Sequence, residues 1–329
     1  MVVRRRSFAL AVLFLIGSFA FVFTTSQGEA SEETRPAALS PEVEPERVVL
    51  PGEVEVLALR AAYPQRVSHA EVRDGEWALE MDGRWFYWAD GRLLPEELRA
   101  QANEFVPVDF SRYEPGPVRE RDIEADREQV LRDRLERQHR RESGVRLRFN
   151  PFKDTLYQIG SWREAERVVQ RIRFLGFSTR VHPFVVEPLA HVERTILAIL
   201  PHDEEVAAFV DGLAAAHGYN WRLIAGTALR SYHSYGVAID VMPRSYGRRF
   251  PYWLWAEQAG IEAWWDYTRT PRWKVPQAVI DAFEAHGFVW GGKWLYFDTL
   301  HFEYRPESFY IAGTRSGDES IQERYSAFF

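Results

Sequence analysis

The sequence predicts an α+β fold with a mainly antiparallel sheet and flanking helices, preceded by a small β-rich module. In residues 52–113, Asp-Gly pairs separate short aromatic segments that alternate in polarity, a pattern typical of β-hairpins. Helical apolar spacing follows at 187–200, 203–217 and 276–286, and the segment LYFDTLHFEY (295–304) alternates like a strand. Because helices and strands come in a mixed order rather than as regular βαβ units, we expect antiparallel pairing.

Size and composition narrow the possible classes of protein. With 329 residues, 46% of them hydrophobic, the chain can form one sizeable core, or a core domain with a smaller module. The net charge is -7 and the pI is near 5.8, which argues against a nucleic-acid partner because phosphate contacts need clustered Lys and Arg. The chain has no cysteine, so any zinc ion must be held by the nitrogens of its nine His or by carboxylate oxygens.

The N-terminus has the layout of a secretory signal. Three arginines at residues 4–6 precede an apolar, uncharged run at 7–23, and residues 28–30 place small side chains at the outer positions of a cleavage site. We therefore expect export to the periplasm or cell envelope. The apolar run is close to the minimum length for crossing a bilayer, so an uncleaved anchor in the inner membrane is the alternative to cleavage.

Composition also divides the chain into segments. Residues 31–50 are rich in Glu, Pro, Ser and Ala, as in linkers, whereas residues 117–143 are dense in Arg and Glu with few apolar positions, as in solvated helices. The predicted order is a signal peptide or signal anchor (1–30), a linker (31–50), a small β-rich module (51–115), a charged helix (116–150), the main domain (151–315) and a C-terminal tail (316–329).

Local signals place further elements in the main domain. Residues 161–164 (SWRE) form a capping box, which predicts a helix that runs to Phe174 and ends at Gly176. A strand is expected at 221–225, directly before the segment SYHSYGVAID. Pro276 near the first turn supports a helix at 276–286.

The segment at 231–240 brings together residues suited to metal binding. His233 precedes a predicted turn at Gly236, and residues 237–241 are predicted to form a strand that enters the core. Asp240 lies among apolar neighbours on this strand, and a buried carboxylate must be paired or metal-bound because an isolated buried charge is very costly. A His before the turn and an Asp on the strand can converge on one ion.

The segment at 290–304 supplies the remaining groups. His301 lies in an apolar stretch, and Asp298 precedes it by three residues, so a bend at 299–300 is needed for both side chains to reach one site. Two His and one carboxylate make a catalytic zinc site that activates a water molecule, and a nearby carboxylate then moves the proton of that water. Asp298 is the candidate base, and Glu303, on the same strand face as His301, is its rival.

At these residues the chain resembles a known group of enzymes. SYHSYGVAID matches the SxHxxGxAxD motif of the VanY-type D-alanyl-D-alanine carboxypeptidases and related peptidoglycan endopeptidases, the LAS zinc-peptidase superfamily, and FDTLHFEY resembles their second motif. The resemblance covers about residues 200–306. It implies the DD-peptidase/hedgehog-like fold, one zinc ion bound by His233, Asp240 and His301, and Asp298 as the general base.

The chain departs from the family pattern at a substrate-binding arginine. Many relatives carry Gly-Tyr-Arg-Ser on the preceding strand, and its Arg contacts the substrate or the developing oxyanion, whereas this chain has Ile-Ala-Gly-Thr at 224–227. Arg222 and Arg230 flank that place, and either could bind a peptide carboxylate through two parallel hydrogen bonds. Ser231 is a further candidate, either beside His233 or as a turn former, and Trp294 is a candidate wall for the substrate.

Together these features predict a zinc-dependent metallopeptidase that acts on peptidoglycan stem peptides outside the inner membrane. D-alanyl-D-alanine carboxypeptidase activity is the first expectation. The alternatives are a peptidoglycan endopeptidase of the same family and a non-catalytic cell-wall-binding module that keeps the metal site. A sugar-binding role for the aromatic β-rich module is compatible with each of these.

Overall fold

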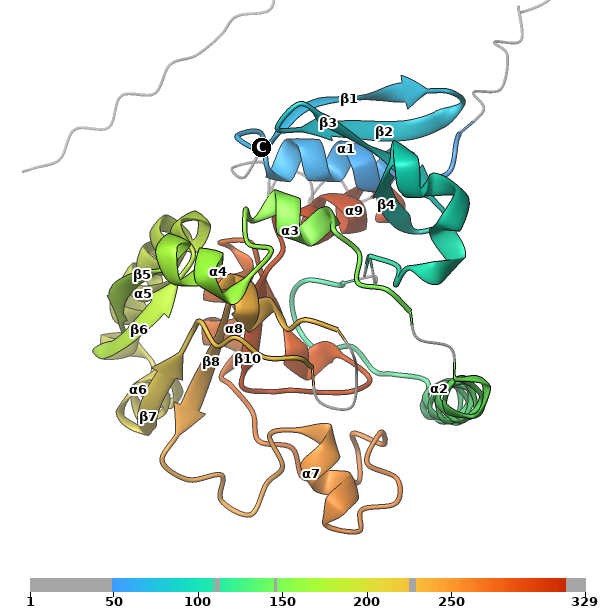
Figure 1. Ribbon diagram of the computed structural model, residues 1–329. Coiled ribbons are helices and arrows are strands. Elements are labelled where there is room, and N and C mark those ends of the chain that lie inside the picture. Colours follow the sequence, from blue (N-terminus) through green and yellow to red (C-terminus); the bar gives the residue numbers. More distant parts are fainter. Residues whose placement is uncertain (1–48, 109, 111–112, 145–146, 225–228, 318–329) are drawn as a thin grey trace, which may run out of the picture. The chain divides into compact units, whose positions relative to one another are not determined.

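The computed structural model describes residues 49–108, 110, 113–144, 147–224 and 229–317 (Figure 1). The predicted export signal lies outside these residues, as do residues 31–48 of the predicted linker and all but the start of the predicted tail. Among the described residues, no helix combines the length and the apolar character needed to cross a membrane.

The described elements mix helices and strands as predicted. The helices are α1 (Glu53–Ala62), α2 (Ile123–Ser143), α3 (Phe152–Leu156), α4 (Trp162–Val168), α5 (Val186–Ile199), α6 (Glu204–Asp211), α7 (Trp253–Gln258), α8 (Gln277–Glu284) and α9 (Pro306–Ser316). The strands are β1 (Val67–Arg73), β2 (Glu76–Met81), β3 (Arg84–Ala89), β4 (Arg92–Pro95), β5 (Gln170–Phe174), β6 (Phe177–Val181), β7 (Leu213–His217), β8 (Ala238–Pro243), β9 (Phe288–Trp290) and β10 (His301–Tyr304). The 3₁₀ segments are η1 (Glu96–Glu104), η2 (Pro183–Val185), η3 (Leu200–His202), η4 (Tyr232–Tyr235) and η5 (Gly291–Lys293).

The β-rich region is a meander in the order β1-β2-β3-β4. Its three tight turns contain the Asp-Gly pairs, and each Asp has a φ of 51° or 52° while the following Gly has a φ between 75° and 81°. Two successive residues with positive φ form the turn type that matches the twist of a hairpin. The hairpins predicted for this region are therefore confirmed.

The β-rich region shares its hydrophobic core with the rest of the described chain. Val56 on α1, Phe86 on β3 and Phe302 on β10 are fully buried members of one cluster. Helix α1 packs against α9, where the Tyr63 hydroxyl donates to Glu307 at 3.0 Å. The boundary predicted at residue 115 therefore separates segments of sequence but not separate cores.

The site is built on a second antiparallel sheet, in the order β7-β8-β10-β9. Strand β8 pairs with β10 so that Asp240 faces His301 and Ile239 faces Phe302. Because side chains alternate along a strand, Asp240, His301 and Glu303 lie on one face, and Ile239 and Phe302 lie on the other. This pairing confirms the predicted α+β class.

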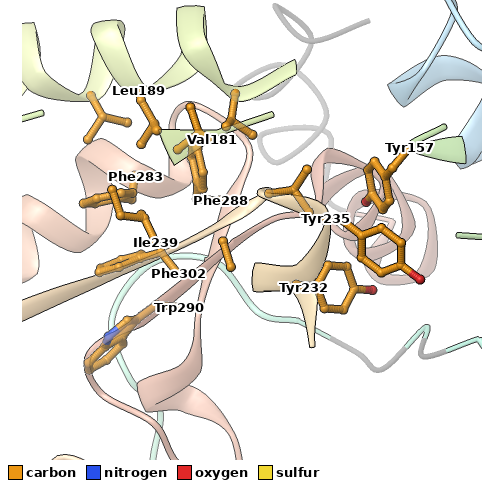
Figure 2. Close-up of a cluster of buried hydrophobic side chains, with 14 of the residues drawn as sticks. Tyr157, Val181, Leu189, Tyr232, Tyr235, Ile239, Phe283, Phe288, Trp290 and Phe302 are labelled. Atoms are coloured by element: carbon orange, nitrogen blue, oxygen red, sulfur yellow. The ribbon is translucent and has the colours of Figure 1, made fainter. Parts of the chain in front are cut away.

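Helices α5 and α8 cover the apolar face of this sheet. Figure 2 shows Leu189 of α5 and Phe283 of α8 above Ile239 and Phe302 of the strands. The rings of Phe283 and Phe302 stack with centroids 3.8 Å apart. This packing fixes the opposite face, which carries Asp240, His301 and Glu303.

Two predicted helices are shorter than expected because strands replace their C-terminal parts. The helix predicted for 161–174 ends at Val168, and residues 170–174 form β5 of a hairpin whose turn is Leu175 (φ 47°) and Gly176 (φ 86°). Gly176 therefore belongs to a hairpin turn rather than a helix end. The helix predicted for 203–217 ends at Asp211, and β7 follows because pairing with β8 outweighs local propensity.

Helix α2 matches the predicted charged helix, within narrower bounds. Asp122 caps it by accepting from the backbone N–H groups of Glu124 and Ala125. Val130 is its buried apolar anchor and packs in a cluster with Trp264 and Phe297. The rest of the helix surface is largely charged and exposed, as expected for a solvated helix.

Candidate active site

His233 is fixed by the short 3₁₀ segment η4. The Ser231 hydroxyl accepts from the His233 backbone N–H at 3.3 Å and so caps the segment. The chain leaves η4 through Gly236, whose φ is 70°. A Cβ at Gly236 would lie 2.8 Å from the His182 backbone nitrogen, so both the conformation and the space require glycine here.

Strands β8 and β10 bring the other two predicted ligands to the same place. The Asp240 Oδ1 atom lies 2.8 Å from His301 Nδ1 and 3.1 Å from His233 Nε2, and these two nitrogens are 3.1 Å apart. Both His are buried, at 1% and 6% exposure. The three predicted metal ligands therefore converge on one point at the edge of the core.

The outer nitrogens of the two His show which nitrogens are available to a metal. His233 Nδ1 lies 2.5 Å from the Gly218 carbonyl oxygen, and His301 Nε2 lies 3.0 Å from Glu303 Oε1. Both partners are acceptors, so these two nitrogens carry the ring protons. When both rings are neutral, the lone pairs of His233 Nε2 and His301 Nδ1 face each other beside the Asp240 carboxylate. This arrangement favours the binding of a cation between them.

This donor set fits zinc. Ligand atoms around one tetrahedral zinc ion lie about 3.3 Å apart, since zinc bonds to nitrogen and oxygen are about 2.0–2.1 Å long. The three separations of 2.8–3.1 Å are slightly below that value, and all the ligand atoms lie within 4.8 Å of one another. Two imidazoles and one carboxylate are also a ligand set of catalytic zinc, and acceptors on both outer nitrogens hold each ring in the required tautomer.

The electrostatics of the cluster favour a charged carboxylate. Burial opposes ionisation of Asp240, but the adjacent His233 and His301 hold the pKa of its carboxyl well below the ordinary value. Burial likewise lowers the pKa of His301, but the acceptors Asp240 and Glu303 outweigh it and raise that pKa well above its ordinary value. Without a metal, His301 thus keeps a proton that a bound cation would displace.

Asp298 lies beside the cluster on the turn predicted for it. Residues 299–300 form this turn, and the Leu300 backbone N–H donates to Asp298 Oδ1 at 3.3 Å. Burial, and to a smaller extent the negative charge of Asp240, raises the pKa of the Asp298 carboxyl to about 6, against the opposing effect of His301. A carboxyl with a pKa near the working pH is suited to accept and return a proton.

Glu303 lies on the predicted strand face but serves a different part of the cluster. Its carboxylate accepts from the His301 nitrogen that points away from Asp240. This position favours a role of Glu303 in orienting His301.

The two candidate arginines differ in their surroundings. Arg230 donates to Asp154 at 2.5 Å and to the Ile159 carbonyl at 3.1 Å, and its guanidinium stacks on Trp221. Its donors are thus directed at the protein. Arg222 is exposed, and its backbone carbonyl accepts from Ser231 N at 3.1 Å.

The charge of Arg222 also acts on Tyr252, which is paired with Asp298. Burial and the Asp298 carboxylate raise the pKa of Tyr252, and the Arg222 cation opposes this rise. Tyr252 and Asp298 are joined by an antiparallel bridge. Of the two candidates, Arg222 is exposed, whereas Arg230 is half-buried.

Trp294 lies next to the cluster and is half-buried. Its ring centroid is 5.7 Å from that of His301, and the ring packs against the cluster formed by Tyr113, Val289 and Phe309. Trp294 is thus placed to form a wall beside the metal ligands.

Sequence reasoning did not identify the Gly218 carbonyl as the partner of His233. This oxygen comes close because Gly218 follows β7, and a Cβ there would lie 2.3 Å from the Arg180 carbonyl oxygen. In the sequence, Gly218 only follows the helix predicted for 203–217, and its partner His233 is 15 residues away, so no local signal indicated this contact.

Comparison with known families agrees with this geometry. Residues 225–304 match a family model described as D-alanyl-D-alanine carboxypeptidase, and residues 55–109 match a model described as a domain of unknown function. The first match contains the three candidate ligands and Asp298, and it supports a hydrolase of the peptidase class. No curated protein and no solved structure matches the chain.

Proposed function

We propose that the chain is a zinc-dependent metallopeptidase that hydrolyses peptide bonds of peptidoglycan stem peptides, with the terminal D-alanyl-D-alanine bond as its first target. The observation that carries the proposal is the convergence of His233, Asp240 and His301 beside Asp298, whose pKa is raised to about 6. The family match over these residues supports the substrate class. The export signal predicted at 1–30 would place the enzyme in the cell envelope, on the side where this substrate lies.

The residues divide the chemistry between them. His233, Asp240 and His301 would hold one zinc ion, which supplies a Lewis acid for the scissile carbonyl and activates water. Asp298 accepts the proton of the attacking water and passes it to the leaving amine, for which its raised pKa is suited. Glu303 and the Gly218 carbonyl keep the two imidazoles in the tautomers that ligation needs.

Substrate recognition would involve the rim of the site. Arg222 is exposed near Tyr252 and Asp298 and can bind the terminal carboxylate of a stem peptide. Ser231 supports substrate binding indirectly through the backbone of His233. Trp294 lies beside His301 and forms a wall for the peptide.

Mass spectrometry of muropeptides incubated with the purified protein tests this proposal. Loss of a terminal D-Ala with zinc, but not with chelator, is the expected result, and Asp240→Ala is the matched control that lacks a ligand. A zinc-dependent cut inside the stem would assign an endopeptidase instead. An unchanged substrate, from a folded and zinc-loaded sample, would leave only the binding-module alternative.

A further inference from the structure

A largely buried hydrogen-bonded cluster lies beside the segment that carries His233 and contains none of the candidate ligands. Asp154, on α3, accepts through Oδ1 from the Tyr235 hydroxyl at 2.8 Å and from Arg230 Nη1 at 2.5 Å. The side chains of Asp154 and Arg230 are 23% and 15% exposed, and Tyr235 is fully buried. One carboxylate oxygen thus joins two side chains that are close to His233 in the sequence.

The two donors to Asp154 lie on either side of His233. Arg230 comes three residues before His233, and Tyr235 comes two residues after it. Arg230 is itself held in place, since its guanidinium lies 4.6 Å from the centroid of the Trp221 ring. A metal ligand keeps its geometry when the residues around it are locked by packing and hydrogen bonds. Asp154 therefore restrains the His233 segment at both of its ends.

The chain that follows Asp154 supports the same segment from a second direction. The ring of Tyr157 lies against that of Tyr235, with centroids 5.1 Å apart (Figure 2). The Tyr157 carbonyl accepts from His182 Nε2 at 3.1 Å, and the His182 backbone N–H donates to the Gly236 carbonyl at 2.8 Å. Residues 154–157 thus reach η4 both through Tyr235 and through the turn that ends it.

The charges and hydrogen bonds of the cluster are matched within it. Asp154 and Arg230 form an ion pair, and the Tyr235 hydroxyl donates to the same carboxylate. Loss of Asp154 would leave the Arg230 cation without its counter-charge and the buried Tyr235 hydroxyl without its acceptor. Because unpaired buried polar groups are costly, the segment would have to shift to give them new partners.

Neither family match contains Asp154. The matches cover residues 55–109 and 225–304. Tyr235 and Arg230 belong to the second match, and Asp154 contacts them only because the chain folds α3 against η4. The cluster therefore brings to the site a residue that the matched motif does not contain.

We propose that Asp154 is a positioning residue, which holds His233 in place for zinc through its hydrogen bonds to Tyr235 and Arg230. The inference rests on the metal site of the proposed function and deepens it by a residue outside the family match. Conformational freedom that a ligand loses on binding counts against affinity, so an ordered His233 segment favours zinc binding. Loss of the cluster should weaken zinc binding although Asp154 is not among the ligands.

Zinc affinity, measured by competition with a chelator, tests the proposal in the full chain. Asp154→Ala removes the acceptor, Asp154→Asn keeps an oxygen that can accept from the Tyr235 hydroxyl, and Tyr235→Phe removes that hydroxyl alone. Met81→Ala is the control for lost stability, because Met81 is fully buried on β2 and its truncation leaves a cavity in the β-rich region. Urea denaturation of the metal-free proteins gives the stability of each variant.

We expect Asp154→Ala to weaken zinc binding about 3- to 10-fold, less than the loss of a direct partner of a ligand. Tyr235→Phe should act in the same direction and add little to Asp154→Ala, because both remove the same hydrogen bond. Asp154→Asn should restore part of the affinity, and Met81→Ala should lower stability alone. An Asp154→Ala protein that loses stability but binds zinc as wild type does would overturn the proposal, as would effects of the two substitutions that simply add.

The positioning role and the proposed function can fail separately. If the wild-type protein binds zinc but hydrolyses no stem peptide, and Asp154→Ala weakens zinc binding, the positioning role stands and the peptidase function falls. If hydrolysis is zinc-dependent and Asp154→Ala keeps the wild-type zinc affinity, the function stands and the positioning role falls. A wild-type protein that binds no zinc would overturn both.

Discussion

Asp298→Asn should stabilise the metal-free protein and, at the same time, abolish turnover. The carboxyl has an ordinary pKa of 3.8, which burial raises to about 6 in the fold. This difference corresponds to about 3 kcal/mol at about 1.4 kcal/mol per tenfold change, and the partial exposure of Asp298 reduces the expected gain to about 1–3 kcal/mol. Asn keeps an oxygen that can accept from Leu300 N, so the turn is preserved.

The pH dependence follows from the sign of this pKa change. The native state holds the Asp298 proton more tightly than the unfolded state, so the ionised carboxyl destabilises the fold above pH 6 and has no such effect below about pH 4. The stabilities of chelated wild-type and Asp298→Asn proteins in urea should therefore diverge as the pH rises from about 4 to about 6, and their difference should stay constant from pH 6 to 8. Asp281→Asn at an exposed position is the control and should change stability by less than about 0.5 kcal/mol.

The Asp298→Asn variant also tests the catalytic role of the carboxyl. Loss of a general base lowers kcat by about 10²- to 10⁴-fold, while zinc content should stay at the wild-type level. A variant that keeps kcat within tenfold would refute the assignment of the base. A stability difference that does not change with pH would refute the raised pKa.

Four further outcomes are expected. Zinc binding near neutral pH should release about one proton, because Asp240 and Glu303 raise the pKa of His301 against the effect of burial. Zinc affinity should therefore rise with pH, and equal calorimetric heats of zinc binding in buffers of different ionisation enthalpy would contradict the proton release. Glu303→Gln should weaken zinc binding about 10- to 100-fold in competition with a chelator, and unchanged affinity would show that the hydrogen bond to His301 is dispensable. Gly236→Ala should destabilise the protein by about 1–3 kcal/mol in urea because of its φ of 70° and the lack of space, and full stability would contradict the close approach. Phe302→Ala should cost about 3–5 kcal/mol, since the ring is fully buried, and a loss below about 1 kcal/mol would show that the face is loosely packed.

Local signals in the sequence predicted the hairpins and the metal ligands. An Asp-Gly pair determines its own turn, so the β1–β4 hairpins follow from neighbouring residues alone. His233 and Asp240 were predicted as ligands of one ion because only one turn and half a strand separate them in the sequence. The bend at 299–300 was predicted because Asp298 and His301 must otherwise face opposite sides of a strand.

Features that depend on distant partners were not predicted. Residues 170–174 and 213–217 have apolar spacing that also suits a helix, and their strands form through pairing with β6 and β8. The Gly218 carbonyl reaches His233 only through tertiary packing, so no motif indicated this contact. Long-range contacts decided both features.

Zinc titration of the metal-stripped protein tests whether hydrolysis depends on one zinc ion bound by His233, Asp240 and His301. The measurement is the rate of D-Ala release from a stem peptide ending in D-alanyl-D-alanine, followed against added zinc. We expect no release without zinc, a linear rise up to one zinc per chain, and no rise for His301→Ala. Release that persists in chelator, or that does not return at one equivalent of zinc, would contradict the assignment of His233, Asp240 and His301 as the ligands of a catalytic ion.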